Sequence, residues 1–475
     1  MNLEHKELFK HSGNYLFAVI ANKALSFISI PVLTYLLTVE DYGVYNVFLS
    51  TLQVVAVILT LNTEVAISRY FYDAKDDTDF KRFVGTSLWF SFLVFCIMSL
   101  LLVVFSPHLS SFCGLEWLLV ILLIPMSLSL VLDSVFQQIY QPLMKSRKIA
   151  TISSINAYGG FILSVLFILS ISEKKYYGLV YGTLTMAFFL GIYYCKEIFK
   201  YATNVFDIKY LKYILSYSLP YLPYSLSSVI LIQFGKLIIG QQEGFHTAGL
   251  YSFASNIAML MMVVITVCHS AWNPFYYRYM NDKDYDKIDG DYDIIWKATL
   301  IFGAFLSLFC YEIGIILAKP QYLSALYLVP ILVVGYVFYQ WSYVFLRNVS
   351  YVKKTIWNAI VVIASGVLNI VLNAILIKEY QEVGVAVSFS LSYLFMLLFS
   401  WLINKYILCA YSTSMKKFVI PFLYFVPIVA MSVYFRIYTE LSILIILCKL
   451  LILLTFTLVI MYKFYKSYLW ELLKR

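Results

Sequence analysis

Long apolar runs, separated by short polar segments, follow one another along the whole chain. Most runs contain about 20 residues, the length that an α-helix needs to cross the hydrocarbon core of a bilayer. A strand of a membrane β-barrel has about ten residues and alternates between apolar and polar positions. These runs are longer and do not alternate, so α-helices are the predicted spanning elements.

The pattern predicts an all-α polytopic membrane protein with about 14 transmembrane helices. The N-terminal segment has no small-residue cleavage site before a short apolar core, so we expect the first span to be retained. The predicted spans are 14–37, 43–67, 83–105, 116–140, 150–172, 176–195, 214–240, 247–271, 294–318, 322–345, 356–377, 383–408, 417–437 and 441–465.

Composition and charge agree with this class and orient the chain. Of the 475 residues, 62% are hydrophobic and 13% are charged, whereas about a quarter of an average soluble chain is charged. With the N-terminus inside, most of the 35 Lys and Arg residues fall in the inner loops, as the positive-inside rule requires. This places both termini in the cytoplasm. The net charge of +9 thus reflects membrane orientation, and no nucleic-acid partner is expected.

Two short polar elbows suggest an internal repeat. Gly43-Val-Tyr45 aligns with Gly249-Leu-Tyr251, and the polar positions of the helices that follow match. Glycine permits a close backbone approach or a positive φ, and tyrosine can lie at the headgroup level. An even number of spans separates the elbows, which predicts two six-helix lobes in a parallel repeat plus two C-terminal helices. The predicted boundaries are 1–195 for the N-terminal lobe, 196–213 for a cytoplasmic linker, 214–409 for the C-terminal lobe and 410–475 for the extra helices.

Polar residues recur on one face of several spans, where lipid would not tolerate them. Helix-to-helix hydrogen bonds would account for many Ser and Asn residues, but an ionisable group inside a span costs several kcal/mol unless it faces protein or water. Lys23 and Lys236 are therefore the leading candidates for a hydrophilic cavity between the lobes. The full predicted cavity is Asn22, Lys23, Ser26, Gln53, Glu64, Ser225, Gln233 and Lys236, with Asp133, Asn369 and Asn373 as a second group.

Neither a cofactor nor a metal is expected. The seven cysteines are scattered, without a CxxC or Cys/His cluster, and the chain has no G-x-x-x-x-G-K-[ST] phosphate loop. No extramembrane domain is large enough to hold another catalytic site, so the prediction is that the protein is not an enzyme.

Several segments resemble one known family. PVLTYLLTVEDYGVYNV, LPYLPYSLSSVILIQFGKLIIGQQEGFHTAGLYSFASNIAML and LNIVLNAILI are similar to segments of the polysaccharide flippases for O-antigen and capsule repeat units, within the multidrug/oligosaccharidyl-lipid/polysaccharide exporter superfamily. The family commonly has Arg after Thr in the first segment, where this chain has Tyr35. It commonly has Asp-Arg in the seventh helix, where this chain has Gly235-Lys236.

The resemblance implies a flippase that moves undecaprenyl-diphosphate-linked oligosaccharide repeat units across the bacterial cytoplasmic membrane by alternating access. Its implied partners are that lipid-linked substrate, membrane lipid and the polysaccharide assembly proteins. The physics agrees, because a sugar chain and a diphosphate would each lose hydration in hydrocarbon at a cost of several kcal/mol per polar group. Embedded lysines would supply counter-charge.

Other functions remain open at this point. A cation-coupled drug antiporter of the same superfamily would be expected to use buried carboxylates, and the first span has none. A membrane polysaccharide polymerase would favour a long outer loop, whereas the outer loops here are short. A non-transporting scaffold has little reason to keep lysines in its spans.

Overall fold

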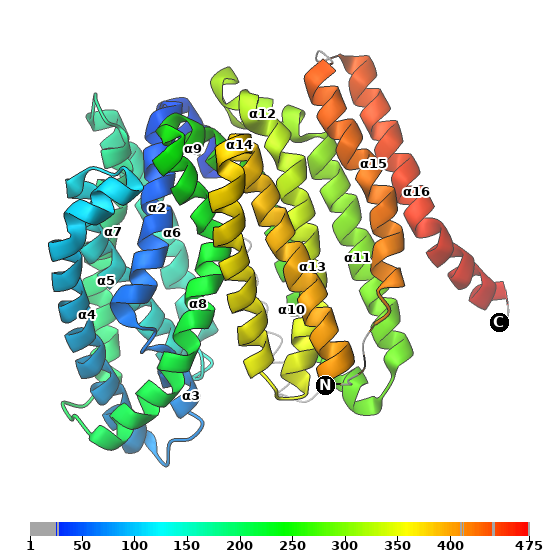
Figure 1. The fold of residues 1–475 in the computed structure, drawn as a ribbon. Helices are drawn as coiled ribbons and strands as arrows, with labels where there is room; N and C mark the ends of the chain where they lie inside the picture. The colour runs from blue at the N-terminus through cyan, green and yellow to red at the C-terminus, as the bar shows by residue number, and fades with distance from the viewer. Residues whose placement is uncertain (1–24, 26–27, 409–410, 412, 439–441, 474–475) are drawn as a thin grey trace. The chain divides into compact units, whose positions relative to one another are not determined.

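The computed structural model describes residues 25, 28–408, 411, 413–438 and 442–473 (Figure 1). The regular structure of these residues is helical and includes no strand, which confirms the predicted all-α class. Most of the predicted first span, 14–37, lies outside the described residues.

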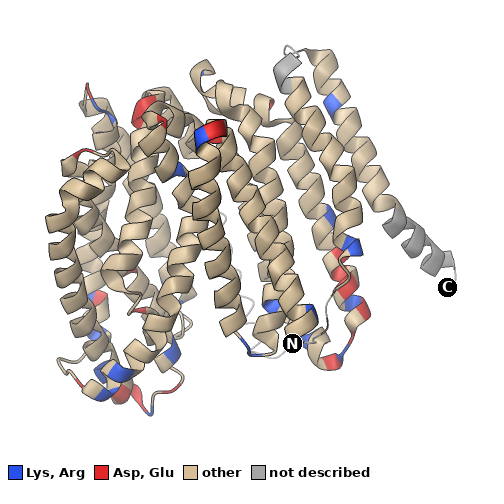
Figure 2. Ribbon diagram, viewed as in Figure 1, with Lys and Arg blue, Asp and Glu red and all other residues tan. Residues whose placement is uncertain are grey.

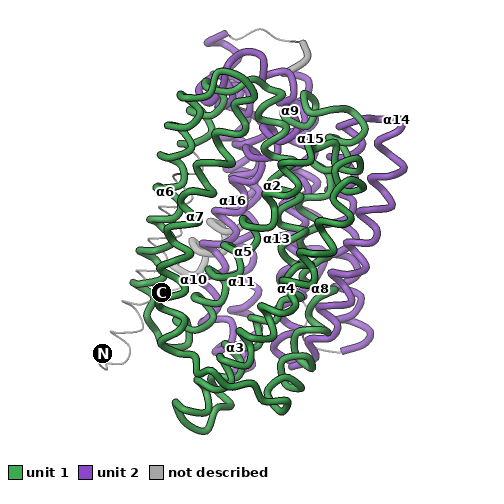
Figure 3. The backbone as a smooth tube through the Cα atoms, turned by 90° about the vertical axis from the view of Figure 1, so that its left-hand side faces the viewer, with its two compact units in different colours: residues 1–249 green, residues 250–475 purple. Residues whose placement is uncertain are grey.

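The chain divides into two compact units, residues 1–249 and 250–475 (Figure 3). The helices of unit 1 are α2 (Val39–Thr60), α3 (Val65–Tyr70), α4 (Asp77–Cys113), α5 (Trp117–Tyr140), α6 (Ser146–Ser170), α7 (Tyr176–Ile198), η1 (Phe199–Tyr201) and α8 (Ile208–Gln242). The next helix, α9 (Gly244–Ala258), contains the unit boundary. The helices of unit 2 are α10 (Met261–Asp282), α11 (Tyr285–Leu308), α12 (Cys310–Leu317), η2 (Pro320–Tyr327), α13 (Leu328–Tyr351), α14 (Ile356–Leu402), η3 (Ile403–Ile407), α15 (Lys416–Tyr438) and α16 (Ile443–Leu473).

Among the described residues, 11 helical segments are long and apolar enough to cross a membrane, or 12 if α11 and α12, bent by 63°, form one span. The multi-pass class is thus confirmed, whereas the predicted number of 14 is not. The segment 356–407 is counted as a single span, although it covers the predicted span 356–377 and all but the last residue of the predicted span 383–408. The backbone of α14 leaves the helical region at Gln381, where φ is 48° and ψ is −133°, and the chain turns back there (Figure 1).

The predicted second span, 43–67, is not one continuous helix. Its backbone adopts positive φ at Leu61 (48°) and Asn62 (51°), so that α2 ends at Thr60 and α3 begins at Val65. Non-glycine residues rarely adopt this conformation, and it is found mainly where the surroundings enforce it. The break separates Glu64 from α2, so the predicted cavity residues Gln53 and Glu64 do not lie on one continuous helix.

The predicted linker, 196–213, is bound closely to α4. The Cβ of an alanine at Gly85 would lie 1.9 Å from the Thr203 carbonyl oxygen, so that only glycine allows this approach. Four hydrogen bonds hold the same segment: Thr203 N to Lys81 O (3.1 Å), Thr86 Oγ1 to Val205 O (3.2 Å), Asp207 N to Thr86 Oγ1 (3.2 Å) and Trp89 Nε1 to Asn204 Oδ1 (2.9 Å). These contacts keep α8 with unit 1, whereas the predicted lobe boundary lies before α8. The repeat itself remains a prediction.

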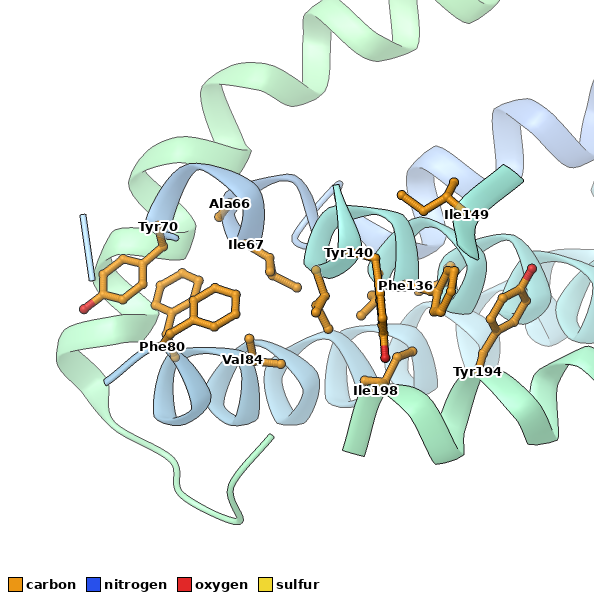
Figure 4. Packing of buried hydrophobic residues seen from close by; sticks show 14 of the residues in the cluster. Ala66, Ile67, Tyr70, Phe80, Val84, Phe136, Tyr140, Ile149, Tyr194 and Ile198 are labelled. Carbon is orange, nitrogen blue, oxygen red and sulfur yellow. The ribbon is translucent and has the colours of Figure 1, made fainter. Parts of the chain in front are cut away.

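An aromatic and aliphatic cluster forms the core at one end of unit 1 (Figure 4). It joins α3, α4, α5, α6, α7 and α8 through buried side chains. Tyr70 stacks on Phe83 with ring centres 3.8 Å apart, and Phe136 stacks on Tyr140 at 4.5 Å. Because lipid tails are as apolar as these side chains, close packing and ring contacts, rather than removal from water, stabilise such a core.

Charged side chains of unit 1 gather near the helix ends (Figure 2). At one end, the buried Glu197 carboxylate accepts hydrogen bonds from Lys148 Nζ (2.5 Å), Lys200 Nζ (2.7 Å) and Tyr140 OH (2.5 Å). In the loop before α5, Glu116 accepts from Lys174 Nζ at 2.5 Å and from Tyr177 OH at 2.7 Å. These hydrogen bonds, led by that of Lys174, hold the pKa of the Glu116 carboxyl below its usual range.

We expect Gly85→Ala to lower the midpoint of thermal unfolding of the purified protein. The added Cβ displaces the Thr203 backbone, and overpacking of this kind costs about 1–3 kcal/mol. Gly160→Ala is the matched control, because its Cβ would meet only side-chain atoms 4.0 Å away and alanine favours a helix. An unchanged midpoint in Gly85→Ala would show that the linker is not held on α4.

Candidate functional site

A polar seam joins α2 and α8 within unit 1. Ser50 on α2 donates from Oγ to Gln233 Oε1 on α8 at 3.0 Å, and Gln233 Nε2 donates to Gln53 Oε1 at 3.0 Å. Ser50 and Gln53 are three residues apart, so both lie on the face of α2 that meets α8. The structure thus brings together two predicted cavity residues, Gln53 and Gln233. Ser50, a polar residue of the helix that follows the first elbow, joins them.

Lys236 lies one turn further along α8, on the face that carries Gln233. It is 8% exposed, and among the described residues no carboxylate forms an ion pair with it. The next turn brings Gly240 against α2, where an added Cβ would lie 2.7 Å from Val47 Cγ2. The two helices therefore approach closely on one side of Lys236 and exchange amide and hydroxyl hydrogen bonds on the other.

The two Gly-x-Tyr elbows contact each other through their glycines. A Cβ on Gly43 would lie 1.8 Å from the Phe245 carbonyl oxygen, and a Cβ on Gly249 would lie 2.1 Å from the Val39 carbonyl oxygen. Gly43 lies near the start of α2, which begins after the N-cap Thr38, and neither Gly43 nor Gly249 has a positive φ. Of the two predicted roles for glycine, close backbone approach is confirmed and positive φ is wrong.

The tyrosine of the second elbow, Tyr251, is buried in the protein. It is 3% exposed, so its ring is not free to contact lipid headgroups. The depth of this residue in the membrane stays a prediction.

The seam continues beyond the break that ends α2. The Asn62 side-chain amide donates to Ser225 Oγ on α8, and Thr63 Oγ1 is 2.6 Å from Ser91 Oγ on α4. Glu64 is buried, and its Oε1 accepts from Ser134 Oγ at 3.4 Å, whereas Oε2 has no hydrogen-bond partner among the described residues. An unpartnered carboxylate oxygen of this kind is costly, so Glu64 is a candidate for protonation or for binding.

Of the remaining predicted residues of the N-terminal lobe, only Asp133 is described, and it does not join this seam. Asn22, Lys23 and Ser26 lie outside the described residues. Both oxygens of Asp133 are used inside unit 1, by Tyr194 OH at 2.8 Å and by Gln137 Nε2 at 2.9 Å. Their role in a cavity remains a prediction.

Asn369 and Asn373 lie in unit 2 and interact with each other. Asn373 Nδ2 donates to Asn369 Oδ1 at 3.0 Å, and Asn369 Nδ2 donates to Ser392 Oγ at 3.1 Å. Both asparagines are buried, and the bond to Ser392 joins the two halves of α14 on either side of Gln381, whereas the bond between the asparagines lies within the first half.

One buried charge was missed by the sequence analysis. Arg347, which counted as an inner-loop cation there, is 4% exposed and lies near His269 in the interior of unit 2. The spacing Gln340, Tyr343, Arg347 places all three on one helical face, which was the available signal. Within the described part of the chain, no group of His, Cys, Asp and Glu side chains could hold a metal ion.

These features define a multi-pass helical membrane protein with an internal polar seam. Residues 8–280 match the family described as "Polysaccharide biosynthesis protein". This match covers more than half of the chain, so the protein belongs to that family, in agreement with the resemblance found in the sequence.

Relatives and solved structures agree with this assignment. A protein of the Lsg locus of Haemophilus influenzae is 24% identical over 292 residues, which cover 58% of this chain and 68% of the relative. The inward closed conformation of the lipid II flippase MurJ has a TM-score of 0.67 at 18% identity, covering 96% of this chain and 99% of that chain. An inward-facing multidrug resistance MATE family transporter of the MOP superfamily has a TM-score of 0.61 at 16% identity, covering 81% and 94%. At these identities the two structures show a shared fold.

We expect Gly43→Ala to separate α2 from α9 and to expose the nearby thiol of Cys113. Cys113 is 2% exposed, and the adjacent Gly114 lies against the Phe245 ring. In a chain whose other cysteines are replaced by serine, Cys113 should react several-fold faster with a maleimide in Gly43→Ala than in its parent. Gly191→Ala is the control, because its Cβ would make only an ordinary contact with Leu132. Equal labelling rates in the three proteins would contradict a tight glycine contact.

Proposed function

We propose that this protein is a flippase that moves undecaprenyl-diphosphate-linked oligosaccharide repeat units from the inner to the outer leaflet of the bacterial cytoplasmic membrane. The single observation that carries the proposal is the polar seam between α2 and α8, which contains Lys236 without a carboxylate partner among the described residues. Both termini would lie in the cytoplasm, as the Lys and Arg distribution indicates.

The seam has the chemistry that such a substrate requires. A diphosphate carries at least two negative charges, and a sugar chain offers many hydroxyl groups. When α2 and α8 separate, the Ser50, Gln53 and Gln233 side chains would be released to hydrogen-bond sugar hydroxyls, and Lys236 would face the diphosphate. In the structure these side chains hydrogen-bond to one another, so fewer of their polar groups are left without a partner while no substrate is bound.

The proposed transport cycle is alternating access, in which the substrate path opens first to one side of the membrane and then to the other. The predicted lobes place α2 in the first repeat and α8 in the second, so the seam would be one closed face of the substrate path. The elbows that meet at Gly43 and Gly249 lie at the predicted outer side, and their contact would close the path there. The likeness of the fold to a lipid II flippase over nearly the whole chain supports this proposal.

The second candidate is an antiporter for small cationic molecules, and the likeness to a MATE family transporter favours it. Such a protein would be expected to attract its substrate with buried carboxylates. In the described part of the seam the embedded charge of α8 is a lysine, and Glu64 is the one carboxylate near it. The flippase is therefore the better supported of the two.

Deletion of the gene followed by extraction of lipid-linked sugars separates the candidate functions. Loss of a flippase should raise the amount of complete lipid-linked repeat units on the inner leaflet and remove surface polysaccharide. Loss of a polymerase would let single units reach the surface, and loss of a drug antiporter would leave the surface polysaccharide intact. Either of the last two results would contradict the proposal.

We expect Lys236→Ala and Lys236→Gln to lower surface polysaccharide by roughly tenfold or more, and Lys236→Arg to retain most of it. Glutamine can donate a hydrogen bond but cannot neutralise a phosphate, and each tenfold loss corresponds to about 1.4 kcal/mol. The measurement is the amount of surface polysaccharide in a deletion strain that carries each variant, normalised to the amount of the protein in the membrane. The same substitutions at Lys23 test the second lysine that the sequence predicts for the cavity.

Lys449→Gln is the matched control for this series. Lys449 is also a buried lysine, but it pairs with Glu312 at 2.7 Å, so its charge already has a partner. We expect this variant to keep transport at normal protein level. If Lys236→Gln and Lys236→Arg restore surface polysaccharide equally, the charge of Lys236 is not needed for transport and the residue contributes only polar packing.

A further inference from the structure

Unit 1 has an apolar groove that opens onto its surface. The groove has a volume of about 620 Å³, within the range of about 300–1,000 Å³ that is usual for ligand sites. It is bordered by α4, α5 and α7 and by the linker that follows α7. Its rim is open, because Trp89 is 52% exposed, Phe92 is 60% exposed and Phe199 is 68% exposed.

The body of the groove is apolar. Leu88, Phe92 and Phe95 line it from α4, and leucine and valine side chains line it from α5. One hydroxyl group of α4 also lies in this lining, but Ser91 Oγ is already 2.6 Å from Thr63 Oγ1. A polar ligand would therefore lose hydration in this part of the groove without gaining hydrogen bonds, whereas a hydrocarbon chain would not.

The length of the groove matches one leaflet of a bilayer. Its lining on α4 runs from Gly85 to Phe95, which corresponds to about 15 Å along a helix. The hydrocarbon core of a bilayer is about 30 Å thick, so the groove is about as deep as one leaflet. Gly85 lies near the start of the predicted span 83–105, so the groove begins near the predicted membrane surface. These dimensions suit the acyl chain of a lipid.

The end of the groove near Gly85 is polar. Trp89, Thr203 and Asn204 line it, and Trp89 Nε1 donates to Asn204 Oδ1 at 2.9 Å. A tryptophan with an apolar ring and a hydrogen-bonded N–H group is typical of the level of the lipid headgroups. The groove thus combines an apolar body with a polar end, which is the arrangement that an amphipathic ligand requires.

Three cations lie beside the polar end. Lys81 and Arg82 come four and three residues before Gly85, so they continue the groove's face of α4 by one turn. The Lys81 carbonyl oxygen accepts from Thr203 N at 3.1 Å, which holds this turn next to the groove. On α7, the exposed Lys196 directly follows a residue of the lining. Among the described residues, none of the three cations forms an ion pair with a carboxylate.

The carboxylates of the same segments have other partners. Asp79 accepts from Tyr210 OH at 2.5 Å, and Asp207 accepts from Lys209 N at 2.8 Å. Glu197 pairs with two lysines of its own. The three cations beside the groove can therefore attract a phosphate group. Basic pockets between helices on the cytoplasmic side of a membrane protein are typical sites for the head groups of anionic lipids.

We propose that this groove binds an anionic phospholipid of the membrane, such as phosphatidylglycerol. One acyl chain would lie between α4, α5 and α7, and the phosphate would lie at Lys81, Arg82 and Lys196. The basic end is at the predicted cytoplasmic side, so the lipid would come from the inner leaflet. The site is formed by unit 1 alone, and it does not depend on what the protein transports.

The test is photo-crosslinking of the purified protein by phosphatidylglycerol or phosphatidylcholine, each with a diazirine on its acyl chain, followed by mapping of the labelled peptides. At equal, subsaturating concentration we expect phosphatidylglycerol to label α4, α5 and α7 roughly tenfold more strongly, because the cations attract an anionic head group. Lys81→Gln combined with Arg82→Gln should remove most of this preference. Cys195→Trp fills the groove and should lower labelling of these helices by both lipids.

Two variants are matched controls. Arg69 lies in the preceding inner loop and pairs with Asp73 at 3.4 Å, so Arg69→Gln removes a cation that already has a partner and should keep the preference for phosphatidylglycerol. Leu166→Trp adds an indole ring at an exposed position of α6, outside the groove, and should leave the labelling unchanged.

Equal labelling by the two lipids, an unchanged preference in the double glutamine variant, or labels confined to other helices would overturn the proposal. If Cys195→Trp does not fold, the labels mapped in the unaltered protein and in the double glutamine variant decide the question. Labelling of these helices by a diazirine-bearing polyprenyl phosphate, but not by phosphatidylglycerol, would assign the groove to that lipid and would also overturn the proposal.

Discussion

The structure depends on one constraint: a polar or charged group inside a bilayer must find its partner within the protein. Water is absent there, so an unpaired donor or charge costs several kcal/mol. Most polar side chains in this protein meet the constraint locally. The Glu197 carboxylate is surrounded by two lysines and a tyrosine, Asn369 pairs with Asn373, and Lys449 pairs with Glu312.

Buried charges without a partner of opposite charge are the candidates for function. In unit 1, Lys236 lies in a seam whose amides and hydroxyl satisfy one another, and it has no acid partner among the described residues. Gly43 and Gly249 allow close backbone contacts near this seam, and Gly240 lies against the Val47 side chain. Gln53 is exposed, so the seam reaches the surface of unit 1, and it consists of neutral hydrogen bonds that a sugar could replace.

Much of the fold could be predicted from the apolar pattern, because span length and hydrophobicity are local properties of the chain. The close approach of Gly43 and the polar faces of α2 and α8 were likewise visible, since both follow from residue type and helical spacing. The seam residues Gln53 and Gln233 were predicted for one cavity and do contact each other.

Other features could not be predicted, because they arise from contacts between distant segments. The break at Leu61 and Asn62 follows no glycine or proline, and the linker is held by Gly85 and Thr86, more than 100 residues before it. Arg347 was assigned to a loop by its position near the end of a span. Its burial follows from the aromatic residues of α10, which sequence spacing alone does not place beside it.

The most direct test of the central claim, that α2 and α8 must separate during transport, is a reversible covalent link across the seam. The Cβ of a residue at Gly240 would lie 3.7 Å from Val47 Cβ, which suits a disulfide, and replacing valine makes room for it. In a background without other cysteines, Val47→Cys combined with Gly240→Cys should transport when reduced and stop when oxidised, while each single variant is unaffected by oxidation. Full transport by the oxidised, cross-linked protein would contradict the account.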